Sequence, residues 1–327
     1  MSATCYRRVA IRTWSCQSSA GDAAASWAAV AAGRSTLIQD ERGHWCGRLR
    51  DRCGDPVGLL TAVAEPAWQA IAAVPGPLAL GLSASKGDPW AMSQALAGHP
   101  GALILAGAEA PNAAVALRLR TGTYLPCAVA AACSTGLYAL LAAADLIEHG
   151  QADRALAGAV DGDLPAWLAA GFTALGVLCG PQVPQAFGHP TGFAPAAGAG
   201  VLGLAHTGAW RLQAGVRLGD AGHETHFVNP STLNHALSAL WLAAPDPDLI
   251  ITHGTGTAAG DAYERTGLES GPWKNCARLA MKPLIGHCLG ASGAVELAVA
   301  CAAPVQRLWK LSLGFGGHLA AVALERA

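Results

Sequence analysis

The sequence predicts an α/β protein in which helices cross over between layered sheets. Short apolar runs that suit buried strands alternate along the chain with alanine-rich runs that suit helices. Hydrophobic residues make up 52% of the 327 residues, which is ample for the core of one large or two moderate domains. The mean hydropathy is positive, at +0.32, and this favours sheets buried on both faces together with a large subunit interface.

The first half of the chain alternates between the two kinds of run. Alanine-rich runs predict helices at 23–32, ending at Gly33, and at 137–148, ending at Gly150, because glycine suits the turn after a helix. A further helix is expected near 57–73. We expect buried strands at 9–14, which would be the first strand of the fold, and at 78–82, 102–106 and 154–159.

The second half repeats the strand-helix-strand order. A strand is expected at 210–218, and Asn229 followed by Pro230 is typical of an N-cap with proline at the first helical position. The apolar run 249–252 then predicts a strand that ends at His253.

Two similar halves are therefore expected, 1–205 and 206–327, with the join near 203–210. No residue-level repeat is visible, so the division is an inference from topology. Glycine and proline are dense at 179–200, which predicts a long irregular connection that either covers a site or is a passive linker.

Bulk composition excludes several classes of protein. The formal net charge is −1, so no global attraction to nucleic acid or to an anionic membrane is expected. Apolar runs are too short for a bilayer span or a signal peptide, and we expect a cytoplasmic protein with its ten cysteines reduced. His223 and His226 are three residues apart, with no nearby cysteine and no His-Glu-x-x-His pattern. We therefore expect no bound metal, and we expect no cofactor.

Three short segments each place one reactive side chain beside flexible glycines: Cys133 in Ala-Cys-Ser-Thr-Gly, His253 in His-Gly-Thr-Gly-Thr and His287 in Lys-Pro-Leu-Ile-Gly-His. Alone, each residue is more typical of a packed core or turn than of a catalyst. Together they suggest a cysteine nucleophile served by two histidines. We expect Cys133 at a helix start, where the positive helix end would lower the pKa of the thiol.

Further motifs accompany these segments in a fixed order: Ser134-Thr135-Gly136 after Cys133, Asp261 and Glu264 after His253-Gly254-Thr255-Gly256-Thr257, Lys282 before Gly286-His287, then Glu296 and Gly314-Phe315-Gly316-Gly317. In order and content they resemble the β-ketoacyl-acyl carrier protein synthases of the thiolase fold. The resemblance runs from Val9 almost to the C-terminus. It implies a five-layered αβαβα fold built from two similar halves.

The resemblance implies a decarboxylative Claisen condensation. Cys133 would take an acyl group from a carrier-protein thioester, which splits the reaction into acylation and condensation. His253 and His287 would polarise the malonyl thioester carbonyl and stabilise the enolate formed as carbon dioxide leaves. The carbanion would then attack the acyl-cysteine.

The same resemblance assigns supporting roles. The backbone N–H groups of Cys133 and Phe315 would form the oxyanion hole, and the Phe315 ring would gate the acyl pocket. Lys282 and Glu296 would form an ion pair that orders the site; the alternative is that Lys282 is a solvated surface lysine and that the acids are ordinary helix-start residues. The remaining implied positions are the acidic residues Asp261 and Glu264 and the substrate-binding residues Thr255, Thr257 and Gly316.

Several positions depart from the family's pattern. The glycine-rich segment 192–200 carries alanine where the family usually has an acid, and Leu311 and Leu313 replace asparagine and phenylalanine near the C-terminus. The hydrogen bonds around the second histidine loop are therefore an open question. The stretch from His287 to Phe315 is also short for the family.

The shortened segments suggest that another subunit covers exposed edges. We expect acyl carrier protein as one partner, and an obligate dimer, preferably a heterodimer with a larger ketosynthase as in type II polyketide or polyene systems. The cluster Arg48, Arg50 and Arg52 either meets an acidic carrier protein or is a solvated loop.

Three hypotheses about the function remain at this point. A condensing enzyme is favoured because Cys133 is present, whereas chain-length factors commonly lack the reactive cysteine. A catalytically silent, chain-length-factor-like partner is the main alternative. A thioesterase or acyltransferase without carbon–carbon bond formation is the third.

Overall fold

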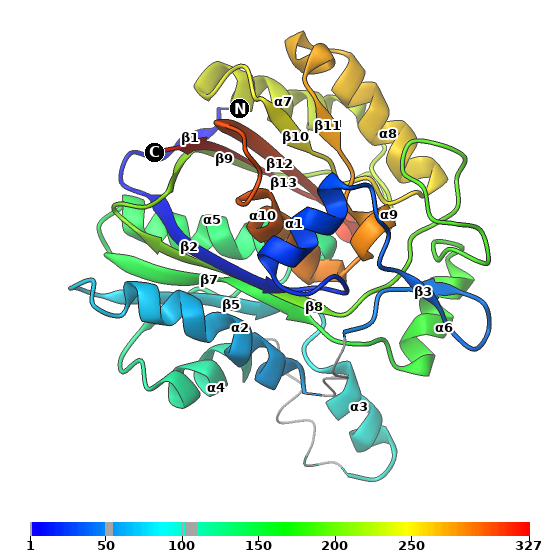
Figure 1. The fold of residues 1–327 in the computed structure, drawn as a ribbon, viewed down its shortest axis with the longest axis horizontal. Helices are drawn as coiled ribbons and strands as arrows, with labels where there is room; N and C mark the ends of the chain where they lie inside the picture. Colours follow the sequence, from blue (N-terminus) through cyan, green and yellow to red (C-terminus); the bar gives the residue numbers. More distant parts are fainter. Residues whose placement is uncertain (1, 50–54, 100, 102–109) are drawn as a thin grey trace.

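The computed structural model describes residues 2–49, 55–99, 101 and 110–327 (Figure 1). The predicted alternation of strands and helices is confirmed over these residues, with one correction. A short strand, β1 (Thr4–Cys5), precedes the strand expected to be first, which is β2 (Ala10–Gln17). The strand predicted at 102–106 lies outside the described residues, and so do Arg50 and Arg52.

The elements have the following bounds. The helices are α1 (Ala23–Ala31), α2 (Pro56–Ile71), α3 (Pro89–Leu96), α4 (Ala110–Leu119), α5 (Thr135–Glu148), α6 (Ala166–Ala174), α7 (Pro230–Ala243), α8 (Ala258–Glu269), α9 (Lys282–Ile285) and α10 (Ser292–Ala300), with short 3₁₀ helices η2 (Ala132–Ser134), η3 (Pro272–Asn275), η4 (Leu289–Ala291) and η5 (Phe315–Gly317). The strands after β2 are β3 (Ile38–Gln39), β4 (Trp45–Cys46), β5 (Leu78–Ala84), β6 (Leu125–Pro126), β7 (Arg154–Asp161), β8 (Gly198–Ala205), β9 (Trp210–Gly219), β10 (Leu249–Ile251), β11 (Arg278–Leu279), β12 (Arg307–Gly314) and β13 (His318–Arg326).

Helix ends follow the predicted local chemistry. Asn229 caps α7, and its side chain accepts a hydrogen bond from the backbone N–H of Ser231 at 3.0 Å. Gly33 and Gly150 follow α1 and α5 with left-handed φ angles of +62° and +71°, a conformation that glycine adopts without a Cβ clash.

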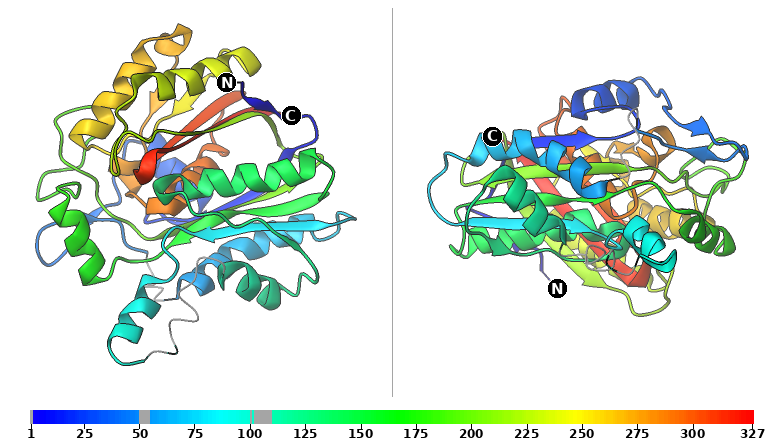
Figure 2. Two further views of the ribbon diagram at one scale, coloured as in Figure 1. Left: turned by 180° about the vertical axis from the view of Figure 1, so that it is seen from behind. Right: turned by 90° about the horizontal axis from the view of Figure 1, so that it is seen from below.

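Within the described residues, eleven strands form one sheet. Its path is β11-β10-β12-β13-β9-β2-β8-β7-β5-β6, with β1 paired to β9. The two halves of the path meet where β2 pairs antiparallel with β9, at Ala10↔Arg211 and Ile11↔Trp210. The sheet bends there, so that its halves face each other across α5 and α10 (Figures 1 and 2).

Five layers result from this bend. Helices α7 and α8 lie outside the half of the sheet that contains β9 to β13, and α2 and α4 lie outside the half that contains β5, β7 and β8 (Figure 1). Helices α5 and α10 fill the middle layer. The fold is therefore the thiolase-like αβαβα arrangement implied by the sequence motifs. The division at residues 205 and 206 falls between β8 and β9 and remains our proposal for the two halves.

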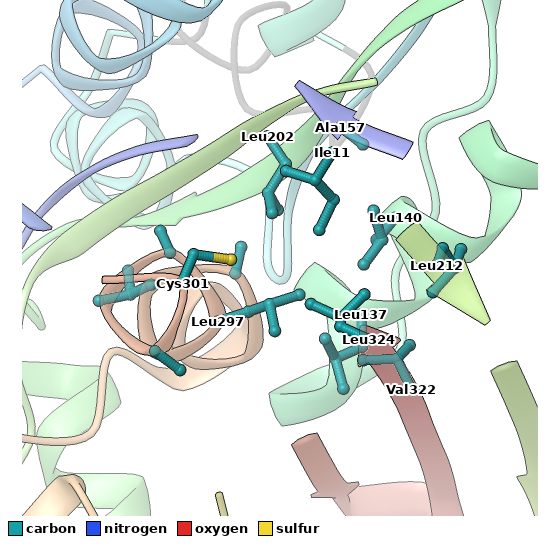
Figure 3. Packing of buried hydrophobic residues seen from close by; sticks show 14 of the residues in the cluster. Ile11, Leu137, Leu140, Ala157, Leu202, Leu212, Leu297, Cys301, Val322 and Leu324 are labelled. Carbon is teal, nitrogen blue, oxygen red and sulfur yellow. The ribbon is translucent and has the colours of Figure 1, made fainter. Parts of the chain in front are cut away.

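The middle layer holds the largest core cluster. Figure 3 shows Leu297 of α10 facing Leu137 of α5, with strand side chains closing the cluster on either side. The two helices approach closely at Gly136, where a Cβ atom would lie 2.6 Å from the backbone nitrogen of Ala294. Because glycine permits this contact, the N-terminal ends of both helices lie side by side, and the reactive segments precede those ends.

Two further observations bear on the sequence predictions. No helix among the described residues is long and apolar enough to cross a membrane. All nine cysteines in the described part of the chain are free thiols.

Candidate functional site

A tight turn presents Cys133 at the start of α5. The preceding residue, Ala132, has a left-handed φ of +45°, which is strained for a residue with a side chain. Thr135 holds the turn, since its hydroxyl accepts a hydrogen bond from Ala131 N at 2.9 Å and donates one to Ala132 O at 2.7 Å. The Ser134 hydroxyl donates to His318 O at 2.7 Å, and this ties the turn to the second half of the fold.

The predicted lowering of the Cys133 pKa is wrong. Burial raises the pKa of the thiol, because enclosure removes the water that would stabilise a thiolate. The positive charges of Lys86 and Lys282, and the backbone N–H of Phe315, oppose this effect without reversing its direction. Cys133 keeps a partly exposed surface, and the raised pKa favours the neutral thiol over the thiolate.

The Phe315 loop lies directly against the cysteine turn. A Cβ atom on Gly314 would lie 2.7 Å from Ala131 O and 3.1 Å from Cys133 N, so this close approach requires glycine. The Phe315 N–H reaches the Cys133 sulfur, and the half-buried Phe315 ring lies 6.4 Å from the ring of Phe172. The amide groups predicted for the oxyanion hole are therefore neighbours.

His253 and His287 come from different loops and meet in the interior. His253 follows β10, and His287 follows α9 through Gly286, which has a φ of +84°. The ring centroids are 5.6 Å apart and the ring planes meet at 84°. Burial, followed by the charge of Lys282, holds the pKa of each histidine well below its usual range. Both imidazoles are therefore neutral at physiological pH.

The hydrogen bonds of His287 leave one ring nitrogen free. Its Nδ1 lies 2.8 Å from Ser292 Oγ, whereas its buried Nε2 has no hydrogen-bond partner among the described residues. A Ser292 hydroxyl that donates to Nδ1 leaves the proton on Nε2, where it is free to bond a ligand. The ring of Phe193 packs edge-on against His287 at 4.8 Å.

Backbone pairing answers the open question about the second histidine loop. His287 N donates to Ala194 O at 2.8 Å, and Ala196 N donates to His287 O at 2.9 Å. The alanines of the segment 192–200 thus hold the loop without an acidic side chain. The irregular connection predicted at 179–200 also reaches the site, since Phe193 lines the cavity there.

The predicted ion pair is present and buried. Lys282 Nζ lies 2.8 Å from Glu296 Oε1, with side-chain exposures of 2% and 1%, so Lys282 is not a solvated surface lysine. Lys282 Nζ also donates to His253 O at 2.6 Å. The two further acids hold the same loop: Glu264 accepts from His253 N, and Asp261 accepts from Gly256 N at 3.0 Å.

One cavity of about 270 Å³ is lined by most of the site residues predicted from the sequence. Cys133, His253 and His287 all line it, together with Phe315, Thr255 and Thr257. Gly316 is not among the lining residues, and its N–H donates to Glu224 O at 2.7 Å. Among the described residues no group of three or more His, Cys, Asp or Glu side chains is arranged to hold a metal ion.

A larger cavity of about 450 Å³ lies elsewhere, beside half-buried Arg48 and exposed Trp90. It contains none of the three reactive groups, so the smaller cavity is the candidate site.

Sequence reasoning missed four residues around the site: Lys86, Phe193, Ser292 and Lys310. Lys310 carried the clearest signal, because a lone lysine between apolar residues of a strand is costly unless it is paired. Ser292 is five positions after His287, across a turn that the sequence did not define.

Comparisons with known proteins agree with this geometry. Residues 113–207 match the family model described as "Beta-ketoacyl synthase, N-terminal domain", and residues 220–315 match "Beta-ketoacyl synthase, C-terminal domain". Together these stretches cover more than half of the chain. They include all three reactive residues.

Two curated relatives illustrate the match. "Nodulation protein E" of Rhizobium leguminosarum bv. trifolii is 30% identical over 193 residues, which are 54% of this chain and 48% of that protein. "3-oxoacyl-[acyl-carrier-protein] synthase 2" of Rhizobium meliloti (strain 1021) is 32% identical over 192 residues, 51% of this chain and 45% of that protein. The chain thus spans about half the length of the curated relatives that it matches.

Solved structures share the fold over nearly the whole chain. A type II polyketide acyl carrier protein complex with its ketosynthase bound to the hexaketide gives a TM-score of 0.86 at 20% identity, covering 98% of this chain and 100% of that chain. The ishigamide ketosynthase/chain length factor gives 0.85 at 22% identity, with the same coverages. Given the two domain matches, the shared layering and the residues gathered at the cavity, this chain belongs to the β-ketoacyl synthase family.

Proposed function

We propose that this protein catalyses a decarboxylative Claisen condensation, in which an acyl group on Cys133 is extended by malonyl-acyl carrier protein to a β-ketoacyl-acyl carrier protein. The observation that carries the proposal is the single cavity lined by Cys133, His253 and His287. A thiol and two neutral imidazoles around one small space suit acyl transfer followed by enolate chemistry.

In the first step the Cys133 sulfur attacks the thioester carbonyl of an acyl-carrier protein. A carbon–sulfur bond to Cys133 forms, the bond to the carrier's thiol breaks, and the proton of the Cys133 thiol ends on the departing carrier thiol. The N–H groups of Cys133 and Phe315 stabilise the negative oxygen of the tetrahedral intermediate. Because burial raises the pKa of the thiol, this step needs the nearby charges of Lys86 and Lys282 to favour developing thiolate.

In the second step malonyl-carrier protein occupies the cavity. Its thioester oxygen accepts hydrogen bonds from His253 and His287, whose low pKa values keep them as neutral donors. The bond to the carboxylate breaks, carbon dioxide leaves, and the electron pair forms an enolate. The enolate carbon then bonds to the acyl carbon, the bond from that carbon to the Cys133 sulfur breaks, and the departing thiolate takes a proton from water.

The proposed partners follow from this reaction. A relative named "3-oxoacyl-[acyl-carrier-protein] synthase 2" and a neighbour solved with an acyl carrier protein support acyl carrier protein as the substrate carrier. Ketosynthase/chain length factor neighbours support a dimer, and we propose a heterodimer with a larger ketosynthase in the cytoplasm. Fatty acid, polyketide and polyene pathways all fit this chemistry.

A chain-length-factor-like role is the second candidate. It is favoured by Leu311 and Leu313, which stand where the family has asparagine and phenylalanine, and by the short stretch between His287 and Phe315. In that role the chain would shape the acyl tunnel of a catalytic partner, and Cys133 would carry no acyl group.

A product assay separates the two. The purified protein, alone and with its candidate ketosynthase partner, is incubated with acyl-carrier protein and ¹³C-malonyl-carrier protein, and β-ketoacyl products are identified by mass spectrometry. A β-ketoacyl product that disappears in Cys133→Ala supports the condensing enzyme. Product that persists in Cys133→Ala but changes chain length supports the tunnel-shaping role, and free acid without elongation supports hydrolysis.

A further inference from the structure

Four charged side chains are buried together behind His253. Lys310 of β12 is 0% exposed, and Lys282, Glu296 and Glu264, from α9, α10 and α8, are 2%, 1% and 1% exposed. Burying a charge is costly unless it is paired, and here two positive charges face two negative ones. The sequence motifs account for three of these residues, whereas Lys310 belongs to none of them.

Lys310 binds the end of the strand that carries His253. In the parallel pairing of β10 with β12 its register partner is Ile251, two residues before the histidine. Its Nζ lies 2.6 Å from Glu296 Oε2 and donates to Thr252 O at 3.1 Å and to Leu311 O at 2.6 Å. All three ammonium protons thus have acceptors.

The other members of the cluster hold the next backbone groups along the loop. Lys282 Nζ donates to His253 O at 2.6 Å. Glu264 accepts from His253 N at 2.6 Å and from Gly254 N at 2.8 Å. Glu296 links the two lysines, with one carboxylate oxygen on each. Three consecutive residues, 252 to 254, are therefore fixed by charge-assisted hydrogen bonds.

Fold stability alone does not account for Lys310. Replacing a buried charge pair by apolar residues of similar volume is often neutral or stabilising, and Lys310 stands among buried apolar neighbours on β12. It also lies outside the residues that line the cavity, so it does not touch substrate. What it touches is the backbone beside a reactive histidine.

We propose that Lys310 is a positioning residue for His253: together with Lys282 and through Glu296, it fixes the carbonyls of Thr252 and His253 and so sets the direction of the His253 ring in the cavity. This inference rests on the proposed condensation for its catalytic consequence. The contacts that carry it are independent of that function.

The pH dependence follows from the groups that face Lys310, which are Glu296, Lys282, Glu264 and His253. Burial lowers the pKa of Lys310, so its charge is lost on the alkaline side. Burial raises the pKa of Glu264, and the charge of Lys310 opposes that rise. Removing the Lys310 charge therefore moves the protonation of Glu264 to higher pH.

The test compares Lys310→Met with Ser312→Ala. Ser312 is buried on the same face of β12, two residues further on, beside Gly293 of α10 rather than the His253 loop. Acylation of Cys133 and malonyl-dependent discharge of the acyl group are timed separately across pH, and backbone amide exchange is measured at His253 and Gly254.

For Lys310→Met we expect the rate of Cys133 acylation to stay within about threefold of wild type and the rate of malonyl-dependent discharge to fall at least about tenfold. The acid limb of the pH profile for the discharge rate should move to higher pH. Amide exchange at His253 and Gly254 should be faster, and Ser312→Ala should leave all of these unchanged. Equal slowing of both steps, or an unmoved acid limb, would overturn the positioning role.

A second variant covers the case in which Lys310→Met does not fold. The arginine in Lys310→Arg stays charged at alkaline pH, so the rate of acyl discharge should persist at the alkaline pH values where the wild-type rate declines. An alkaline limb of the pH profile that is the same in variant and wild type would contradict the inference. If wild type forms no acyl adduct at Cys133, the proposed function fails. The amide exchange at His253 and Gly254 in Lys310→Met then decides for or against the inference on its own.

Discussion

The ring of His287 lies 5.6 Å from the ring of His253, and the two planes are nearly perpendicular at 84°. The two loops that carry these rings are held by separate sets of contacts: Lys282, Glu264 and Lys310 hold the first, and the backbone of the segment 192–200 holds the second. Two neutral donors thus reach one cavity from two loops, and Lys282 links these loops because it begins α9, the helix that precedes His287. A thioester oxygen between them would accept a hydrogen bond from each.

Replacing either histidine should remove enolate stabilisation. For His287→Ala we expect malonyl-dependent discharge of acyl-Cys133 to fall by about 10²–10³-fold, which is typical for loss of one oxyanion donor. Acylation of Cys133 should fall far less, because its oxyanion is held by Cys133 and Phe315. Stopped-flow or quenched measurements of the two steps test this; equal losses in both would show that His287 also serves acylation.

Ser292→Ala should have a milder effect of the same kind. The variant loses the hydrogen bond that sets the His287 tautomer, and a net contribution of about 0.5–1.5 kcal/mol corresponds to a discharge rate about 2–10-fold lower. KM for malonyl-carrier protein should change little. Ser292→Thr, which keeps the hydroxyl, is the matched control and should recover most of the rate.

The Cys133 thiol should titrate at high pH. Because burial raises its pKa, the thiolate fraction at neutral pH is smaller than for an unperturbed cysteine, and alkylation by iodoacetamide should speed up through a midpoint above that of an unperturbed cysteine. Peptide-level mass spectrometry follows Cys133 separately from exposed Cys5. Lys86→Met should move the midpoint higher still, and a midpoint below the ordinary value would contradict the burial argument.

Gly314→Ala should disrupt the cysteine turn. Its Cβ would lie 2.7 Å from Ala131 O and 3.1 Å from Cys133 N, so either the turn or the Phe315 loop must shift. We expect acylation to fall at least about tenfold, since misplaced donors lose transition-state stabilisation. Gly171→Ala, in open space on α6, is the control, and it should leave acylation unchanged while stabilising the helix by about 0.5–1 kcal/mol.

The middle layer should dominate stability. Leu297→Ala removes a fully buried side chain of α10 and should lower the free energy of unfolding by about 2–5 kcal/mol. Leu242→Ala, on a side chain that is 86% exposed, should change it by no more than about 0.5 kcal/mol. Urea unfolding monitored by tryptophan fluorescence measures both, and similar values would argue against the layered core as the main source of stability.

The features that the sequence predicted correctly depend on residues that are neighbours along the chain. Caps such as Asn229, glycine stops such as Gly150 and the apolar strand before His253 depend on neighbouring residues, and each appears where expected. The resemblance to the family's motifs predicted the pairing of Lys282 with Glu296, although the two residues come from different helices.

Long-range contacts account for what the sequence could not supply. The direction of the Cys133 pKa depends on how the Phe315 loop and the surrounding protein enclose the sulfur, and the local helix-end argument has no access to that enclosure. Likewise, the pairing of Lys310 with Glu296 requires knowing that β12 lies beside β10 and faces α10.

The central claim is that Cys133 carries the acyl group, and intact-protein mass spectrometry with peptide mapping tests it most directly. After incubation with acyl-carrier protein, we predict one acyl adduct on wild type, mapped to Cys133 and absent from Cys133→Ala. The adduct should disappear when malonyl-carrier protein is added. No adduct on folded wild type, or an adduct that maps to another cysteine, would contradict the claim.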